Sequence, residues 1–530
     1  MHPNPANSKE RTDAVIPERA SNSDATYANP LLFLDFPDPD GIRVGDEYFL
    51  ICSTFSHEPG IVLARSRDLV HWTHCGHALP RLMRREEFDR PRRGCGVWAP
   101  SLRHHDGRFL IYFPDPDAGI YMTHAHEFEG PWSEPVLVLA GRGLIDPCPL
   151  WDDDGRAWLV HAWAKSRAGI NNRVTLVELR PDGTGTIGDG KVIIDADALP
   201  GWHTLEGPKF YKRGGWYYVF APAGGVEDGW QGIFRARALD GPWEARVVMD
   251  QGTTPINGPH QGAWIDTPNG EHWFLHFQDR GPFGRILHLQ PMRWRDDGWP
   301  VIGATNSPDA IKGEPVLEHA APSVVSGEAD EAEGWPTSDE FDGPVLGRQW
   351  QWEGAHDPAW YSLEAVPGSL RLYSQSGDNL WEAPSLLTQR VVGPESIVST
   401  SLRIEGGGRF GLVVMGRDYA SLEIESDGVH VRLVQRVCRG ADEGNREEAR
   451  MEGPAVSGSG ARLRVDVVEG SAWRFSYSSD EGRSWTSIGE PFVGRKGVWV
   501  GARVGVFALT GASGDTGVHA DFDFFRVEMR

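Results

Sequence analysis

The sequence predicts an all-β protein, a five-bladed β-propeller followed by a β-sandwich. Glycine (64 residues), proline (38) and tryptophan (22) are abundant, which is typical of many short strands joined by tight turns. A segment made of an apolar stretch, a DG- or GG-type turn and an aromatic-rich stretch recurs five times before residue 304. After residue 338 the pattern changes to strict alternation of apolar and polar residues, which is typical of half-buried antiparallel strands.

The five copies of the first pattern begin at Phe36, Val97, Leu144, Leu205 and Asn257. They are spaced by roughly 45–60 residues, which is the length of a four-stranded propeller blade. Each copy opens with a polar or aromatic residue beside or close to a proline, and proline is tolerated at the first residue of a strand. Because the innermost strand of each blade lines the central channel, we expect one residue per blade to face a common funnel.

The composition divides the chain into four parts. Residues 1–26 contain few apolar residues, and we expect a disordered N-terminal tail. Residues 27–303 form the expected propeller. Residues 304–337 are rich in Pro, Ala, Ser and acidic residues, which predicts a linker. Residues 338–530 form the expected sandwich, with alternation at 398–404, 463–467 and 473–477.

Charge and hydropathy restrict the partners. With 52 Lys and Arg against 75 Asp and Glu, the net charge is −23, which disfavours nucleic acid and anionic membranes and suits a neutral ligand such as a small oligosaccharide or glycoside. No apolar run is long enough to cross a bilayer, and no signal peptide is visible at the N-terminus, so we expect a cytoplasmic protein. The sequence leaves an oligomer open.

Three carboxylates occupy blade-opening positions: Asp38, Asp146 and Glu206. Hydrolysis of a glycosidic bond needs one protonated carboxyl for the leaving oxygen and one carboxylate to activate water. A third carboxylate nearby can raise the pKa of the acid by like-charge repulsion. Turn residues at strand starts are the structural alternative. Period-two alternation would place Asp40 on the same face as Asp38, so the residues alone leave Asp40 open.

Several motifs occur together in one order: FPDP at Phe36, VWAPS, IDP followed by WDDDG, EGPKFYK, PHQGAW and HLQPMRW. In this set the chain resembles the glycoside hydrolase family 43 enzymes, which are five-bladed propeller, inverting glycosidases, over roughly residues 27–304. From residue 338, the segments DEFDG, APSLLTQR and DFDFFRVE resemble the concanavalin-like C-terminal sandwich of family β-xylosidases and α-L-arabinofuranosidases.

The resemblance implies a role for each carboxylate. Asp38 matches the general base, Glu206 the general acid, and Asp146 the residue that modulates the pKa of the acid and orients it. Inversion in one step requires roughly 6.5–9.5 Å between the base and the acid, so that a water fits between them.

Four further residues are expected at the substrate. The resemblance assigns Arg285 to a sugar hydroxyl near the acid, and Trp98 to the aromatic wall of the subsite, where sugar C–H faces stack on indole. Phe55 and Trp163 follow two blade-opening hairpins and are expected to line the pocket with weaker support. A surface position for Arg285 and a purely structural role for Trp98 are the alternatives.

The metal predictions concern two places. The resemblance puts His260 beside a calcium ion or water in the channel, although calcium prefers oxygen donors, and a core histidine bound to backbone groups is the alternative. In the sandwich, four acidic residues near the beginning and the end of the segment 338–530 would bind a structural calcium. Solvated turn acids are the alternative. These residues are Glu340, Asp342, Asp521 and Asp523. The chemistry itself requires no cofactor.

We therefore expect an exo-acting, inverting glycosidase that releases terminal β-1,4-xylosyl or α-L-arabinofuranosyl units from hemicellulose-derived oligosaccharides. The first alternative is a non-catalytic glycan-binding protein made of propeller and sandwich, which the intact set of three carboxylates disfavours. The second is a retaining β-fructosidase on a similar fold, whose WMNDPNG, RDP and EC motifs are missing here. Retention would also need carboxyls only about 5–5.5 Å apart.

Overall fold

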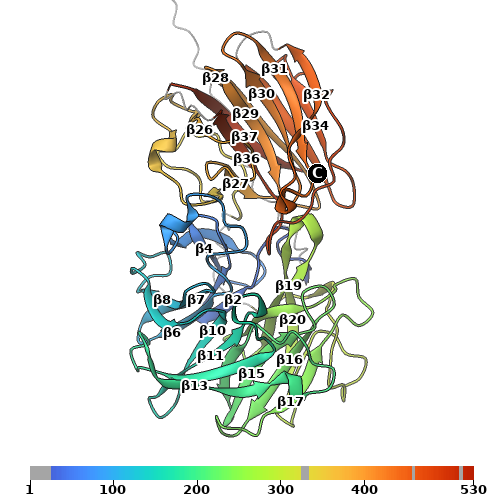
Figure 1. Cartoon of the computed structure of the whole chain (residues 1–530). Coiled ribbons are helices and arrows are strands. Elements are labelled where there is room, and N and C mark those ends of the chain that lie inside the picture. The colour runs from blue at the N-terminus through green and yellow to red at the C-terminus, as the bar shows by residue number, and fades with distance from the viewer. Residues whose placement is uncertain (1–25, 324–333, 456–459, 512–516) are drawn as a thin grey trace, which may run out of the picture.

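The computed structural model describes residues 26–323, 334–455, 460–511 and 517–530. The tail expected at 1–26 lies outside the described residues except for Thr26, which begins a short strand. Figure 1 shows two bodies stacked along the long axis of the molecule, the propeller below and the sandwich above. Within the described ranges, no helix is both long and apolar enough to cross a membrane.

Five four-stranded antiparallel sheets form the propeller, each from four consecutive strands, which confirms the predicted fold class. The first two blades are β2 (Asp40–Val44), β3 (Glu47–Cys52), β4 (Gly60–Ser66), β5 (Thr73–Leu79), and β6 (Ser101–His105), β7 (Arg108–Asp115), β8 (Gly119–Ala125), β9 (Val136–Ala140). The third is β10 (Leu144–Trp151), β11 (Ala157–Trp163), β12 (Arg173–Leu179), β13 (Thr186–Asp195). The last two are β14 (Lys209–Arg213), β15 (Trp216–Ala223), β16 (Trp230–Ala236), β17 (Glu244–Met249), and β18 (His260–Asp266), β19 (His272–Asp279), β20 (Arg285–Trp294), β21 (Pro300–Ile302).

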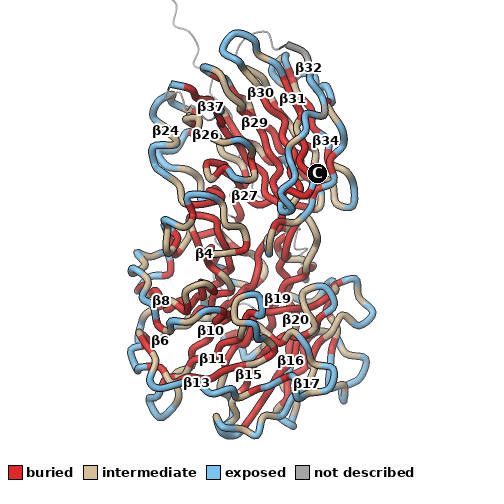
Figure 2. The backbone as a smooth tube through the Cα atoms, in the orientation of Figure 1, coloured by how far each residue is buried: buried red, intermediate tan, exposed pale blue. Residues whose placement is uncertain are grey.

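Side-chain packing closes the ring, because no strand is shared between the first and fifth blades in the described sheets. Leu50 and Val62 of the first blade share one buried cluster with Ile265 and Leu275 of the fifth. Figure 2 shows that buried segments run through the strands while the turns at the rim are exposed. The ring is therefore held mainly by apolar burial between neighbouring blades.

Charged side chains meet where the inner strands converge. Asp40 is fully buried and accepts hydrogen bonds from the backbone N–H of Leu102 (2.8 Å) and from Arg103 Nη1 (3.0 Å). Lys209 Nζ lies 3.6 Å from the same carboxylate. Asp40 thus links three blades through an ion pair network. The sequence left open whether Asp40 could take the place of Asp38, and these contacts give Asp40 a structural role.

Much of the segment expected as a linker lies against the propeller. Strand β22 (Glu318–Ala320) pairs with β1 (Thr26–Ala28), and Ala304 forms a bridge with Glu314. Trp335 is buried and packs edge-to-face on Phe36. Residues 324–333 lie outside the described part of the chain. The sequence predicted a linker, whereas much of this segment packs on the propeller. Its apolar residues explain the packing, because they bury surface against the ring.

Two sheets form the sandwich. One contains β23 (Gln351–Trp352), β26 (Gln375–Ser376), β27 (Leu387–Arg390), β29 (Gly408–Met415), β30 (Tyr419–Ser426), β31 (Val431–Cys438), β32 (Glu448–Ala455) and β36 (Arg503–Thr510). The other contains β24 (Tyr361–Ser362), β25 (Leu370–Tyr373), β28 (Glu395–Glu405), β33 (Gly460–Val468), β34 (Arg474–Ser478), β35 (Thr486–Ser487) and β37 (His519–Met529). Helices are short: α1 (Lys165–Ala168), η1 (Arg85–Phe88), η2 (Ala196–Ala198), η3 (Gly281–Phe283), η4 (Pro358–Trp360) and η5 (Ala441–Glu443).

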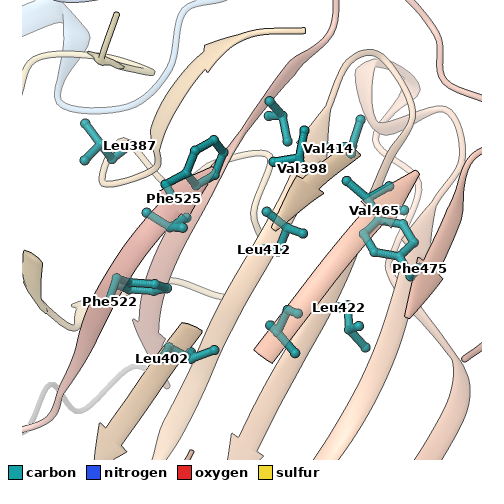
Figure 3. Close-up of a cluster of buried hydrophobic side chains, with 14 of the residues drawn as sticks. Leu387, Val398, Leu402, Leu412, Val414, Leu422, Val465, Phe475, Phe522 and Phe525 are labelled. Atoms are coloured by element: carbon teal, nitrogen blue, oxygen red, sulfur yellow. The ribbon is translucent and has the colours of Figure 1, made fainter. Parts of the chain in front are cut away.

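The apolar faces of the two sheets meet in one core. Val398, Leu402, Val465 and Phe475 come from the alternating segments of the sequence, and all are buried in this core (Figure 3). Residues spaced by two along a strand share a face, so the alternation correctly predicted which side chains point inward.

The core of the sandwich continues into the propeller. Phe283, in the connection between β19 and β20, and Ile286, in β20, belong to the same buried cluster as the sandwich side chains. Backbone bonds cross the boundary as well: Ala502 N–H donates to Pro282 O (2.6 Å), and Trp352 N–H donates to Glu58 O (2.7 Å). The sandwich is therefore packed directly on the propeller.

Candidate active site

The starts of four inner strands share a left-handed backbone kink. Asp38 and Asp146 both have φ of 54°, which is rare for residues other than glycine. The kink falls on Gly207, directly after Glu206, in the fourth blade, and on Gln261, directly after His260, in the fifth. Strained backbone of this kind concentrates at functional sites, where surrounding contacts hold it. In the third and fifth blades the kink coincides with a break in the strand register, so the regular alternation of side chains is interrupted there.

Asp38 is held by two donors. Arg285 Nη1 donates to Asp38 Oδ1 at 2.5 Å, and Ser53 Oγ donates to Oδ2 at 2.6 Å. Asp38 and Arg285 are both buried, with 4% and 7% of their surfaces exposed. These two donors fix the orientation of the Asp38 carboxyl, whose oxygens act as hydrogen-bond acceptors.

Arg285 is itself positioned by a second acid. Its backbone N–H donates to Asp35 Oδ1 at 2.8 Å, and Asp35 also accepts from the backbone N–H of Gly501, which belongs to the sandwich. Burial raises the pKa of Asp35, and these backbone donors oppose that shift. Asp35 therefore connects the cation beside Asp38 with a loop of the second domain.

Asp146 lies close to Glu206. The backbone N–H of Gly207 donates to Asp146 Oδ2 at 2.7 Å. Burial, followed by the charge of Glu206, raises the pKa of Asp146 to about 7, and the charge of Asp38 has a smaller effect in the same direction. Asp146 therefore holds its proton up to about neutral pH.

His260 contacts Glu206. Its Nε2 lies 2.9 Å from Glu206 Oε1, and the ring is fully buried. His260 Nδ1 is buried and has no hydrogen-bond partner. An unpaired N–H costs more than an unpaired lone pair, so the ring proton belongs on Nε2, which then donates to Glu206. His260, which the resemblance puts beside a calcium ion or water in the channel, thus contacts one of the three carboxylates, and the cation stays a prediction.

The aromatic wall combines both domains. The rings of Phe55 and Trp98 lie 6.0 Å apart, and Trp98 lies 6.2 Å from Trp499, a residue of the sandwich. The guanidinium of Arg285 lies 5.9 Å from the ring of Trp499 and 4.9 Å from the ring of Phe277. Trp499 is 45% exposed and has φ of 67°, so the loop that carries it presents an indole beside the site in a strained conformation.

Trp163 differs from its expected position. It packs against the apolar cluster between the second and third blades, and its Nε1 donates to Thr175 Oγ1 at 2.9 Å. The preceding residue, Ala162, faces the cluster on which Trp98 packs. Successive residues of a strand face opposite sides, so Trp163 points away from the aromatic wall.

The four acidic residues of the sandwich are not gathered around a common point. Glu340 forms a two-bond pair with Arg526 (2.6 and 2.9 Å), and Asp521 forms one with Arg371 (2.7 and 2.9 Å). Asp342 and Asp523 do not complete a ligand set: among the described residues, no group of three or more His, Cys, Asp and Glu side chains could hold a metal ion, and the same holds around His260. Bidentate pairing with arginine uses the carboxylate oxygens that a calcium ion would need.

Sequence reasoning missed Ser53, Asp35 and Trp499. Asp35 stands three residues before Asp38, so proximity to the motif was a usable signal. Trp499 lies between glycines in the segment GVWVG, more than 200 residues after Arg285, and no local pattern connects it to the propeller.

Comparison with known proteins agrees with this architecture. Residues 27–300 match the model of glycosyl hydrolases family 43, and residues 338–528 match the β-xylosidase C-terminal concanavalin A-like domain. A putative β-xylosidase of Xylanibacter ruminicola is 36% identical over 91% of this chain and 86% of the relative. A non-reducing end α-L-arabinofuranosidase of Bacteroides ovatus is 30% identical over 78% of this chain and 79% of the relative.

A solved structure shows the same two-domain arrangement. The xylan β-1,4-xylosidase from Bacillus halodurans superimposes with a TM-score of 0.83 at 27% identity, covering 94% of this chain and 99% of that one. The family model spans more than half of the chain and includes all three carboxylates. The chain belongs to glycosyl hydrolase family 43 and is a glycoside hydrolase with a concanavalin A-like C-terminal domain.

Proposed function

We propose that this glycoside hydrolase is an inverting exo-enzyme that releases terminal pentose units, β-1,4-xylosyl, α-L-arabinofuranosyl or both, from hemicellulose-derived oligosaccharides. The observation that carries the proposal is the contrast between the carboxyls. Asp38 is held between Arg285 and Ser53, whereas Asp146, with a pKa of about 7, shares the neighbourhood of Glu206. Inverting hydrolysis requires one carboxyl as general base and another as general acid, and the proposal gives these roles to Asp38 and Glu206.

In the proposed reaction, Asp38 takes a proton from a water that attacks the anomeric carbon. Glu206 donates a proton to the departing glycosidic oxygen as the bond to the anomeric carbon breaks. His260 orients the carboxyl of Glu206 through Nε2, and Asp146 lies beside Glu206 as the residue that modulates the acid. The general base ends protonated and the general acid ionised, so a proton exchange with solvent restores the enzyme.

An exo mode is supported by the sandwich loop that carries Trp499. Its indole stands beside Arg285 and Trp98, which puts a wall from the second domain next to the carboxylates. A wall of this kind favours a pocket that accepts a chain end over a cleft open at both sides. Pentose specificity is supported by the names of the two relatives, a putative β-xylosidase and an α-L-arabinofuranosidase.

A substrate panel with product analysis tests the proposal. We expect cleavage of an aryl β-xyloside, an aryl α-L-arabinofuranoside or both, and ¹H NMR during early turnover should detect the inverted anomer first. Retention of configuration would contradict the mechanism. Cleavage of neither glycoside would contradict the substrate class.

Glu206→Gln tests the role of the acid. Hydrolysis of an unactivated pentose disaccharide should fall by about 10²–10⁴-fold, because the departing oxygen then leaves without a proton. A dinitrophenyl pentoside, whose leaving group needs no proton, should lose much less. Glu364→Gln, an exposed residue of the sandwich, is the matched control and should leave both rates unchanged.

A further inference from the structure

A buried carboxylate of the sandwich lies among the three chain segments that carry the aromatic wall of the site. Glu353 directly follows β23 and is 1% exposed. Its Oε2 lies 3.2 Å from Arg93 Nη2, and its Oε1 lies 3.5 Å from His57 Nε2 and 3.7 Å from Arg503 Nε. Thr388 Oγ1 donates to Oε1 at 3.0 Å. Because Arg93 and His57 belong to the propeller, Glu353 joins the two domains.

The backbone beside Arg93 contacts both indoles of the wall. The next residue, Gly94, accepts a hydrogen bond from Trp98 Nε1 at 3.0 Å. A Cβ atom at Gly94 would lie 2.6 Å from Val498 Cγ1 and 3.2 Å from Trp499 Cδ1, so the sandwich loop packs directly on this glycine. A displacement of Arg93 would therefore move the support of both indoles.

A small cavity connects the Glu353 cluster with the rest of the wall. It has a volume of about 20 Å³, close to the space that one water molecule needs. Its lining comes from both domains and includes Phe55, His57, Glu353, Val498, Val500 and Arg503. His57 follows Phe55 by two residues, and Arg503 follows Trp499 by four. The partners of Glu353 and the segments of the wall thus pack around one space.

The charge of Glu353 stabilises this arrangement. Burial alone would raise the pKa of Glu353, but the contacts with His57, Arg93 and Arg503 lower the pKa below its usual value, so the carboxyl is ionised. The side chains of Arg93 and Arg503 are themselves only 9% and 5% exposed. Loss of the carboxylate would leave both guanidiniums buried without their counter-ion, which is strongly unfavourable. The segments that carry them would then rearrange.

We propose that Glu353 is a positioning residue for the substrate, which acts through its three charged partners to hold the aromatic wall in the arrangement that binds the terminal sugar. The inference rests on the proposed function, in which the wall contacts the sugar. It gives the sandwich a role in substrate affinity without any contact between Glu353 and the sugar. A cluster that merely joins the domains would affect stability and leave substrate binding unchanged.

Glu353→Gln removes the charge and keeps the size of the side chain. With the aryl pentoside that the wild type cleaves best, KM should rise about fivefold or more while kcat stays within about twofold, because the wall binds the sugar and transfers no proton. Steady-state kinetics well below the melting temperature of the variant measures both constants. Arg348→Gln is the matched control: it removes another contact between the domains, from Arg348 Nη1 to His74 O (3.1 Å), and should leave KM unchanged.

A double-mutant cycle tests whether Glu353 acts through the wall. Trp499→Ala removes one indole of the wall at a position that is 45% exposed. In that background, Glu353→Gln should raise KM by only about twofold or less, because changes that act on the same interaction are not additive. The full increase in both backgrounds would overturn the proposal.

Arg93→Gln is the second variant, and it decides the question if Glu353→Gln does not fold. It leaves Glu353 paired with Arg503 inside the sandwich and breaks the link to the propeller, so KM should rise about threefold or more. An unchanged KM in a folded variant, or a decrease of kcat alone, would overturn the proposal. Failure of the wild type to cleave any aryl pentoside would instead reject the proposed function.

Discussion

The propeller and the sandwich are both built from antiparallel strands, yet they place buried polar groups differently. In the propeller, the inner strands converge on an axis, and charged residues such as Asp38, Asp40 and Lys209 are buried there. In the sandwich, two sheets meet face to face, and the space between them is filled by residues such as Leu412 and Val465. Radial packing brings strand starts together, whereas layered packing brings strand faces together.

The comparison shows where each domain can bury polar side chains. A polar group at the start of an inner strand can meet partners from other blades, as Asp40 of the first blade does with Arg103 of the second and Lys209 of the fourth. In the middle of the sandwich the neighbouring side chains are mostly apolar, so a polar group there depends on a backbone partner, as Thr400 does by donating to Phe524 O (2.7 Å). We therefore expect substitutions at the starts of the inner propeller strands to affect catalysis, and substitutions in the sandwich core to affect stability.

The largest expected effect is that of Asp38→Asn. An amide cannot accept a proton from the attacking water, so kcat should fall by about 10³-fold on disaccharide and aryl pentoside alike. Steady-state kinetics with both substrates measures this. Equal losses on both distinguish the base from Glu206, whose loss depends on the leaving group. A variant that keeps more than a tenth of the activity would contradict the assignment.

Leu412→Ala tests the expectation that a substitution in the sandwich core affects stability and leaves catalysis intact. The side chain is fully buried between the two sheets, and its truncation should lower the free energy of unfolding by about 2–5 kcal/mol. The kcat of the folded protein should stay within about twofold of wild type, because the site is formed by strand starts of the propeller. Chemical denaturation and kinetics at low temperature measure the two effects. Loss of activity without loss of stability would contradict this expectation.

Asp146→Asn should change the pH dependence of stability. Because the pKa of Asp146 is raised from 3.8 to about 7, folding takes up a proton between these pH values, and native stability falls as the pH rises through this window. The amide removes this cost, so the variant should be more stable than wild type by up to about 4 kcal/mol above pH 7, and the gain should vanish below pH 4. Unfolding at pH 4, 6 and 8 measures this.

The same variant should be nearly inactive on disaccharides, because the carboxyl beside Glu206 that modulates the acid is then missing. Asp153→Asn, at an exposed turn of the third blade, is the control and should show no gain of stability between pH 4 and 8. A gain of equal size at every pH would indicate a cause other than the titration of Asp146.

His260→Asn should have a moderate effect. Without the hydrogen bond from Nε2, the carboxyl of Glu206 loses its fixed orientation, and kcat for a disaccharide should fall about tenfold with little change in KM. An aryl pentoside with a good leaving group should be affected less. An equal decrease for both substrates would indicate that His260 acts on binding or on the fold.

The smallest expected effect is that of metal removal. Glu340 and Asp521 bind arginines, and His260 binds Glu206, so we expect EDTA to shift the melting temperature by less than about 2 °C and to leave kcat unchanged. Differential scanning fluorimetry with and without added calcium measures this. A large loss of stability that calcium restores would show a site formed by other residues.

Particular elements show how far the sequence could be interpreted. The motifs around Asp38, Asp146 and Glu206 were recognisable because the repeat places them at equivalent positions of different blades. The alternation at 398–404 correctly indicated the buried face of β28. Trp163 was placed wrongly because a strand has two faces, and a one-residue difference from Ala162 decides which of them meets the site.

The sequence by itself determined the all-β class, the number of blades and the residue types at each strand start, because these follow from local periodicity and turn chemistry. Only the tertiary structure decided that Arg285 binds Asp38, that His260 binds Glu206 and that Trp499 stands beside them. These pairs join residues of different blades or of different domains. Their distances depend on how the ring closes and how the sandwich packs on it, and short-range sequence patterns do not encode that geometry.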